Sequence, residues 1–199
     1  MKKIKKILAA NRSEIAIRIF RAAEESGIKT AAIYSKEDRF ALHRFKTDES
    51  YLVGEGKGPI QAYLDINSII DIAKKAGVDA IHPGYGFLSE NPDLADQCEK
   101  NNIIFIGPTK EILNRLGNKT AAKEVADEAG VSTIPSVKVN EENKKTIHDE
   151  VNKIGYPVIV KASWGGGGRG MRVVRSADEL SEQIELAQSE SQKAFGKDE

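Results

Sequence analysis

The chain has 199 residues, of which 40% are hydrophobic, enough for a buried core in one large or two small domains. Lysine plus arginine and aspartate plus glutamate number 30 each, so the zero net charge gives no footprint for nucleic acid or an anionic membrane. The lone Cys98 excludes an internal disulfide and a cysteine metal cluster, and no apolar run suits a signal peptide or a membrane span, so we expect a cytoplasmic protein.

The first 130 residues alternate short apolar runs with amphipathic segments. Glycines at Gly27, Gly77 and Gly130 are placed to end helices. The repeated strand and helix units predict an α/β fold with a doubly wound parallel sheet. The pattern predicts strands at 7–10, 30–34, 51–53, 80–81 and 103–106 and helices at 14–25, 66–76, 91–101 and 119–129.

Beyond Val131 the pattern changes to a polar, turn-rich segment, so we place a domain boundary there and expect domains at 1–131 and 132–199. The second domain is expected to be a small α+β module in which two antiparallel strands are joined by glycines. No strand follows the last predicted helix, so we expect this module to be partial and the less stable of the two. The predicted elements are helices at 147–154 and 177–195 and strands at 157–162 and 171–175.

The strongest chemical signal is Lys161 on a predicted strand, followed by a glycine-rich stretch. Glycines let backbone N–H groups approach phosphate oxygens, and a lysine held on a strand adds a fixed positive charge, so the pattern indicates polyphosphate binding. It is not a P-loop, in which the lysine follows the glycines and opens a helix. The alternative is a purely structural hairpin turn. The stretch is Gly165, Gly166, Gly167, Gly168, Arg169, Gly170 and Met171.

The segment from His82 to Asn91 follows a predicted strand, at the edge where open α/β sheets bind ligands. Tyr85 can project into the crevice, and Ser89 or Asn91 can cap the next helix. The alternative is a packed structural loop. Lys119, at the start of a predicted helix, either faces a cleft between the domains or is a solvated surface lysine.

No Gly-x-Gly-x-x-Gly pattern follows the first strand, which argues against dinucleotide binding. Arg12 and Glu14 in that position are interpreted as structural or inter-domain ion pairs. The basic cluster at 43–46 is interpreted as a solvated face. None of the three histidines lies at metal-ligand spacing from another, so we expect no metal ligands in this chain.

Four segments together resemble the biotin carboxylase component of biotin-dependent carboxylases, which has an ATP-grasp fold. These segments are 8–16, 80–91, 105–108 and 161–171. Within that family, residues 43–46, 117–119, 163–164 and 194–199 look like pyruvate carboxylases, whereas several acyl-CoA carboxylases carry Gly in place of Ser13 and Asp in place of Asn118. The resemblance implies that 1–131 is the Rossmann-like pre-ATP-grasp domain and that 132–199 is part of the ATP-grasp lid.

By this resemblance, Lys119, Lys161 and the stretch Gly165 to Met171 contact ATP, and Tyr85 lines the biotin side of the cleft. The implied reaction is the first half-reaction of a pyruvate carboxylase, in which ATP, Mg²⁺ and bicarbonate carboxylate biotin on a carrier domain before pyruvate becomes oxaloacetate. The resemblance also implies carboxyltransferase domains and a homo-oligomer in the complete enzyme. It places the catalytic residues and the Mg²⁺ ligands beyond Glu199, so we expect a ligase module that is inactive by itself and binds ATP weakly.

Three alternatives remain open at the level of sequence. The chain could belong to the biotin carboxylase subunit of an acyl-CoA carboxylase. It could be a non-catalytic nucleotide-binding protein built from the same two domains. It could also be a different ATP-grasp ligase, although the joint presence of residues 82–91 and 168–171 argues against that.

Overall fold

The computed structural model describes residues 3–117, 119–140, 143, 146–161 and 171–195. The chain divides into two compact units, residues 1–114 and 115–199, which are described separately below. The domain boundary predicted near Val131 stays a prediction. Among the described residues, no helix has both the length and the apolar character needed to cross a bilayer.

The first unit is built on a five-stranded sheet in the order β3-β2-β1-β4-β5, with every neighbouring pair parallel. This confirms the predicted doubly wound parallel sheet. The central strand pairs on both sides, so that Leu8 lies between Ala31 and Ile81. The strands are β1 (Lys6–Ala9), β2 (Lys29–Tyr34), β3 (Glu49–Leu52), β4 (Ala80–His82) and β5 (Ile104–Phe105).

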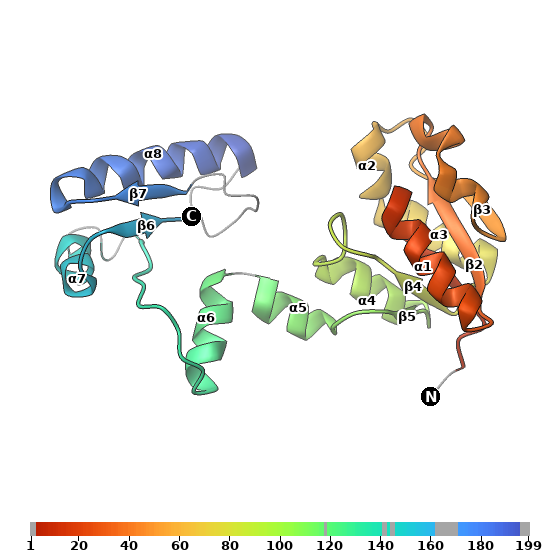
Figure 1. The fold of residues 1–199 in the computed structure, drawn as a ribbon, viewed down its shortest axis with the longest axis horizontal. Helices are drawn as coiled ribbons and strands as arrows, with labels where there is room; N and C mark the ends of the chain where they lie inside the picture. Colours follow the sequence, from red (N-terminus) through yellow and green to blue (C-terminus); the bar gives the residue numbers. More distant parts are fainter. Residues whose placement is uncertain (1–2, 118, 141–142, 144–145, 162–170, 196–199) are drawn as a thin grey trace. The chain divides into compact units, whose positions relative to one another are not determined.

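Successive side chains of a strand point to opposite faces of the sheet, and helices cover the apolar side chains on both faces. Leu8 belongs to the core under α3 and α4, whereas Ile7 and Ala9 pack on the other face with Ala23 and Ala16 of α1. Figure 1 shows this layering in the red to green part of the chain. The helices of this unit are α1 (Ser13–Glu25), α2 (Pro59–Tyr63), α3 (Ile66–Ala76) and α4 (Pro92–Lys100), and α5 (Lys110–Gly117) crosses the boundary between the two units.

The caps of two of these helices follow from their sequences. Gly77 ends α3 in the left-handed conformation, with φ of 62°, as its position predicted. The Asn91 side chain accepts hydrogen bonds from the backbone N–H groups of Asp93 and Leu94 at the start of α4. The structure also contains α2, α5 and two 3-10 helices, η1 (Glu37–Phe40) and η2 (Leu42–Phe45), that the sequence pattern did not predict.

The second unit contains the predicted antiparallel pair of strands. Ile159 of β6 lies opposite Val173 of β7, and Val160 lies opposite Arg172. Figure 1 shows α8 running along the two strands, and α7 and α8 share one core with them around Val151, Val174 and Leu180. The elements are α6 (Lys119–Glu128), α7 (Ile147–Ile154), β6 (Val158–Val160), β7 (Arg172–Val174) and α8 (Ala177–Phe195).

A glycine in the turn after β3 is required by close packing. At Gly54 the backbone has φ of 61°, and an added Cβ would lie 2.4 Å from the Cα of Ala62. Gly56 has φ of 79° but nothing within 4 Å of such a Cβ. Both positions have a left-handed backbone, but only Gly54 is buried and would clash with its surroundings.

We therefore expect Gly54→Ala to lower the free energy of unfolding by about 2–4 kcal/mol, because backbone would have to move, and Gly56→Ala to lower it by about 1 kcal/mol. Urea denaturation followed by circular dichroism measures both. Equal losses in the two variants would show that the contact with Ala62 carries no energetic weight.

Candidate functional site

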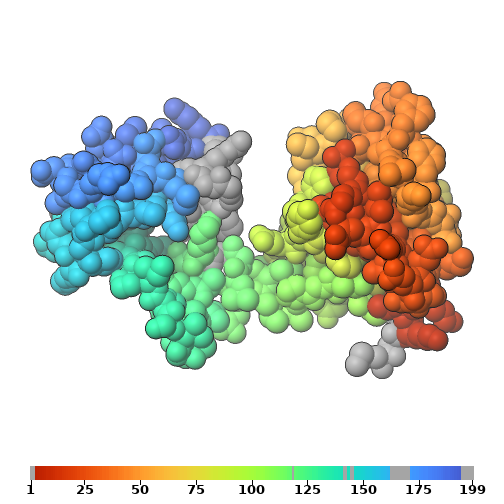
Figure 2. Space-filling model, viewed as in Figure 1, coloured from red at the N-terminus to blue at the C-terminus, as the bar shows by residue number. Residues whose placement is uncertain are grey.

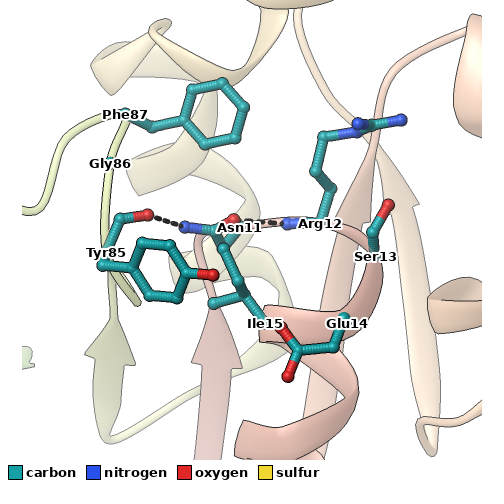
Figure 3. A pocket seen from close by; sticks show the side chains of 8 residues that line it. All are labelled: Asn11, Arg12, Ser13, Glu14, Ile15, Tyr85, Gly86 and Phe87. Atoms are coloured by element: carbon teal, nitrogen blue, oxygen red, sulfur yellow. Dashed lines mark hydrogen bonds between the residues drawn. The ribbon is translucent and has the colours of Figure 1, made fainter. Parts of the chain in front are cut away.

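The site lies where the sheet changes its winding direction. From β1 the chain builds β2 and β3 on one side, and then returns to place β4 and β5 on the other. Ligands of open α/β sheets bind at the carboxyl ends of the two strands that flank such a point. Here the turns after β1 and β4 line an open pocket of about 450 Å³ (Figure 3). Its lining residues are Asn11, Arg12, Ser13, Glu14, Ile15, Tyr85, Gly86 and Phe87.

The fully buried side chain of Asn11 joins the two turns. Its Nδ2 donates to the carbonyl oxygens of Pro83 at 2.7 Å and Tyr85 at 3.0 Å, and its Oδ1 accepts from the backbone N–H of Arg12 at 2.9 Å. Figure 2 shows the red residues after β1 and the yellow-green residues after β4 side by side on the surface. Both N–H donors of the Asn11 amide are therefore paired.

Arg12 forms an ion pair within the first unit, which agrees with the structural interpretation of this residue. Its guanidinium lies 2.5 Å from a carboxylate oxygen of Asp38, which also accepts a hydrogen bond from the Tyr63 hydroxyl at 2.7 Å. The hydrogen bond from Arg12 lowers the pKa of Asp38 below its ordinary value, and burial followed by the bond to Asp38 raises the pKa of Tyr63. At pH 7 the Asp38 carboxyl is therefore ionised and the Tyr63 hydroxyl is neutral.

The same network reaches the far wall of the pocket. The Tyr63 ring stacks on the Phe87 ring with centroids 5.1 Å apart and an interplanar angle of 17°. Phe87 has φ of 42° and Ser13 has φ of 52°, so two non-glycine residues of the pocket hold a left-handed backbone conformation. Such residues persist only where their surroundings hold them, and they concentrate at functional sites.

Tyr85 is 71% exposed and lies in the wall of the pocket, so the structure places it at the sheet edge that the sequence predicted. In Figure 3 its ring lies beside Asn11, and the Phe87 ring projects from the same side of the loop. Nearby His82 accepts a hydrogen bond from the backbone N–H of Gly84 at 3.0 Å on Nδ1, and burial lowers its pKa. We assign His82 a local structural role.

In the second unit, the structure describes two of the predicted ATP-contacting residues at one end of the strand pair. Lys161 follows β6 and Met171 precedes β7, and both side chains are exposed. Because Val160 pairs with Arg172, the two residues lie at the same end of the hairpin. Lys119 is exposed at the start of α6. Gly165, Gly166, Gly167, Gly168, Arg169 and Gly170 lie outside the described residues.

One face of the strand pair carries exposed apolar side chains. Ile159 and Val173, which lie opposite each other, are 54% and 52% exposed, and Met171, two positions before Val173, is 52% exposed. The other face packs Val158, Val160 and Val174 against α7 and α8. Within the described part of this unit, an apolar surface with Lys161 at its edge is thus left open.

Sequence reasoning missed two residues that support the first pocket, Asp38 and Tyr63, and it gave Phe87, within the segment 82–91, no role of its own. The basic cluster at 43–46 was also interpreted wrongly in one respect, because His43 is fully buried and its Nε2 lies 3.1 Å from the carbonyl oxygen of Ile33. A buried asparagine directly after an apolar strand was the available signal for Asn11, since its amide must find backbone partners.

Comparison with known families gives two matches that together span almost the whole chain. Residues 3–113 match the family "Biotin carboxylase, N-terminal domain", and residues 118–199 match "Carbamoyl-phosphate synthase L chain, ATP binding domain". The pyruvate carboxylase of Bacillus subtilis is 57% identical over 196 residues. That match covers 98% of this chain and 17% of the relative, so the chain spans about one sixth of that relative's length.

Solved structures give the same result. A pyruvate carboxylase variant of Rhizobium etli with acetyl coenzyme A has a TM-score of 0.88 and 53% identity, over 99% of this chain and 18% of that one. The biotin carboxylase domain of the 2-oxoglutarate carboxylase of Hydrogenobacter thermophilus, solved with MgADP, ADP and bicarbonate, has a TM-score of 0.91 and 43% identity. That match covers all of this chain and 43% of the other.

The buried His43 makes the stability of the first unit depend on pH. Burial lowers its pKa below the ordinary value of 6.5; Asp38 partly opposes this shift and Arg12 adds to it. Its Nδ1 has no hydrogen-bond partner, so protonation would bury an unpaired N–H. A lowered histidine pKa means that its contribution to stability is complete above pH 6.5 and is lost as the pH falls through the folded-state pKa.

We therefore expect the free energy of unfolding to fall more steeply below pH 6.5 in the natural protein than in His43→Gln, which can still donate to Ile33 but does not titrate. The difference in slope should approach about 1.4 kcal/mol per pH unit. Denaturant titrations between pH 5 and 8 measure it. Parallel stability curves for the two proteins would contradict the expectation.

Proposed function

The chain belongs to the biotin carboxylase family, and from this we propose that it serves as the amino-terminal part of an enzyme that carboxylates biotin with ATP and bicarbonate. In this proposal the reaction is the first half-reaction of a pyruvate carboxylase, which converts pyruvate to oxaloacetate. The pyruvate carboxylases of Bacillus subtilis and Rhizobium etli are 57% and 53% identical to the chain, against 43% for the 2-oxoglutarate carboxylase domain, and this difference supports pyruvate as the acceptor.

The observation that carries the ATP assignment is the open face of the strand pair. Ile159, Met171 and Val173 present an exposed apolar surface that suits a planar base, and Lys161 stands at its edge. An ammonium held beside a strand can pair with phosphate oxygens, while the apolar surface covers the base. We propose Lys119 and the stretch Gly165 to Gly170, with Arg169, as further phosphate contacts on the basis of the family motif.

ATP supplies the phosphoryl group that activates bicarbonate, and the residues of this chain hold the nucleotide and orient it. Lys161 is proposed to keep a positive charge on the phosphates as they transfer, which stabilises the developing negative charge. Mg²⁺ is expected to be held elsewhere, since the described residues contain no group of three or more His, Cys, Asp or Glu side chains placed to hold a metal ion.

We further propose that the pocket between the turns after β1 and β4 is the biotin side of the reaction centre, with Tyr85 in its wall. The expected partners are a biotin carrier domain, carboxyltransferase domains and further copies of the subunit. The dimeric 2-oxoglutarate carboxylase domain supports an oligomeric enzyme. We propose a cytoplasmic location on the basis of the same family membership.

The assignment of Lys161 can be tested in the full-length enzyme. Lys161→Ala is expected to lower kcat/KM for ATP by about 10- to 150-fold, the equivalent of a charged hydrogen bond of about 1.5–3 kcal/mol. The measurement is bicarbonate-dependent ATP hydrolysis. Lys153→Ala, which removes an exposed lysine of α7, is the matched control and should stay near the natural rate. ATPase activity of Lys161→Ala within a factor of two of the natural enzyme would disprove its role.

A further inference from the structure

The loop from Pro83 to Phe87, which carries Tyr85, is held by two consecutive residues of the turn after β1. We propose that Asn11 is a positioning residue that fixes the backbone at Tyr85 and thereby sets the affinity of the enzyme for biotin, an inference that rests on the proposed function of the pocket. Asn11 does not act on substrate itself, since its amide is fully buried and is occupied by backbone groups.

The hydrogen bond of Asn11 to the carbonyl oxygen of Tyr85 is the direct contact. It fixes the peptide plane that leaves Tyr85, while the bond to the Pro83 carbonyl fixes the start of the loop, 2.7 Å from the same nitrogen. No apolar side chain could satisfy these two carbonyl groups, of which that of Pro83 is bonded in the interior, and an ionised aspartate would turn acceptor oxygens toward them. An amide at this position therefore has a specific function in the loop.

Arg12 supports the other end of the loop through an indirect route. Arg12 pairs with Asp38, Asp38 accepts the Tyr63 hydroxyl, and the Tyr63 ring stacks on Phe87. The backbone N–H of Ser35 also donates to the Tyr63 oxygen at 3.2 Å, so the hydroxyl of this ring is held by two hydrogen bonds. Tyr85 thus lies between two held points, the Asn11 amide and the Phe87 ring.

Gly84 shows how closely the loop approaches Asn11. A Cβ at Gly84, where φ is 68°, would lie 2.8 Å from Nδ2 of Asn11 and 2.5 Å from Cγ2 of Ile15. Any side chain at this position would lift the loop from the amide. Because Tyr85 is 71% exposed, its ring depends on the backbone for its placement, and displacements of about 1 Å can change rates by on the order of 100-fold.

The test uses the full-length enzyme with free biotin as the substrate. Asn11→Ala is expected to raise KM for biotin about tenfold while bicarbonate-dependent ATP hydrolysis without biotin stays within a factor of two. Hydrogen exchange followed by mass spectrometry should become faster in the peptide that contains residues 83–87 and stay unchanged in β1. Asn101→Ala is the matched control, because it removes one amide hydrogen bond to a backbone carbonyl, that of Gln97, away from the pocket.

A second variant keeps the inference testable if Asn11→Ala fails to fold. Gly84→Ala leaves Asn11 in place and displaces the loop, so it should raise KM for biotin and speed exchange in the same peptide. An unchanged biotin KM in either folded variant, or a biotin KM that rises in Asn101→Ala as well, would overturn the inference. If the natural enzyme carboxylates no biotin at all, the proposed function fails; unchanged exchange at 83–87 in Asn11→Ala would instead refute the positioning role alone.

Discussion

The geometry of the first pocket depends on a single buried amide. Asn11 follows the central strand, and its two N–H donors reach carbonyl groups that are 72 and 74 residues away in the sequence. A parallel sheet brings the carboxyl ends of its strands to one edge but leaves the turns there free to differ. The Asn11 amide removes that freedom for the turn after β4, because leaving the Pro83 carbonyl unpaired in the interior would be costly.

In the second unit, one face of the two-stranded sheet is buried and the other face is exposed. Two short strands have little stability without a cover, and α7 and α8 supply it on the side of Val174 and Leu180. The exposed face of Ile159 and Val173 is consistent with a surface that meets a ligand, since contiguous exposed apolar side chains are uncommon without such a purpose. The first unit is proposed to bind through its turns, and the second through a strand face.

Periodicity predicted the main elements because each one is long enough or apolar enough to show it. The helix from Ile66 to Ala76 was predicted with the same bounds, since a buried stripe and a closing glycine both mark it. The short helices α2 and α5 were missed, although Pro59 after Gly58 is a typical helix start. The contacts around Asp38 could not be predicted, because Arg12, Asp38 and Tyr63 come together only through the sheet order.

The pairing of β1 with β4 has a consequence for synthesis of the chain. The first strand leaves the ribosome early, yet one of its edges finds its partner only when residues 80–82 have been made, as the pairs Ile7 with Ala80 and Leu8 with Ile81 require. At about 5–20 residues per second, this delay is roughly 4–15 s, during which an apolar strand edge stays unpaired. Closure of the pocket by Asn11 and pairing of β1 with β4 therefore belong to the same late step in the synthesis of this unit, because both require residues of the segment 80–85.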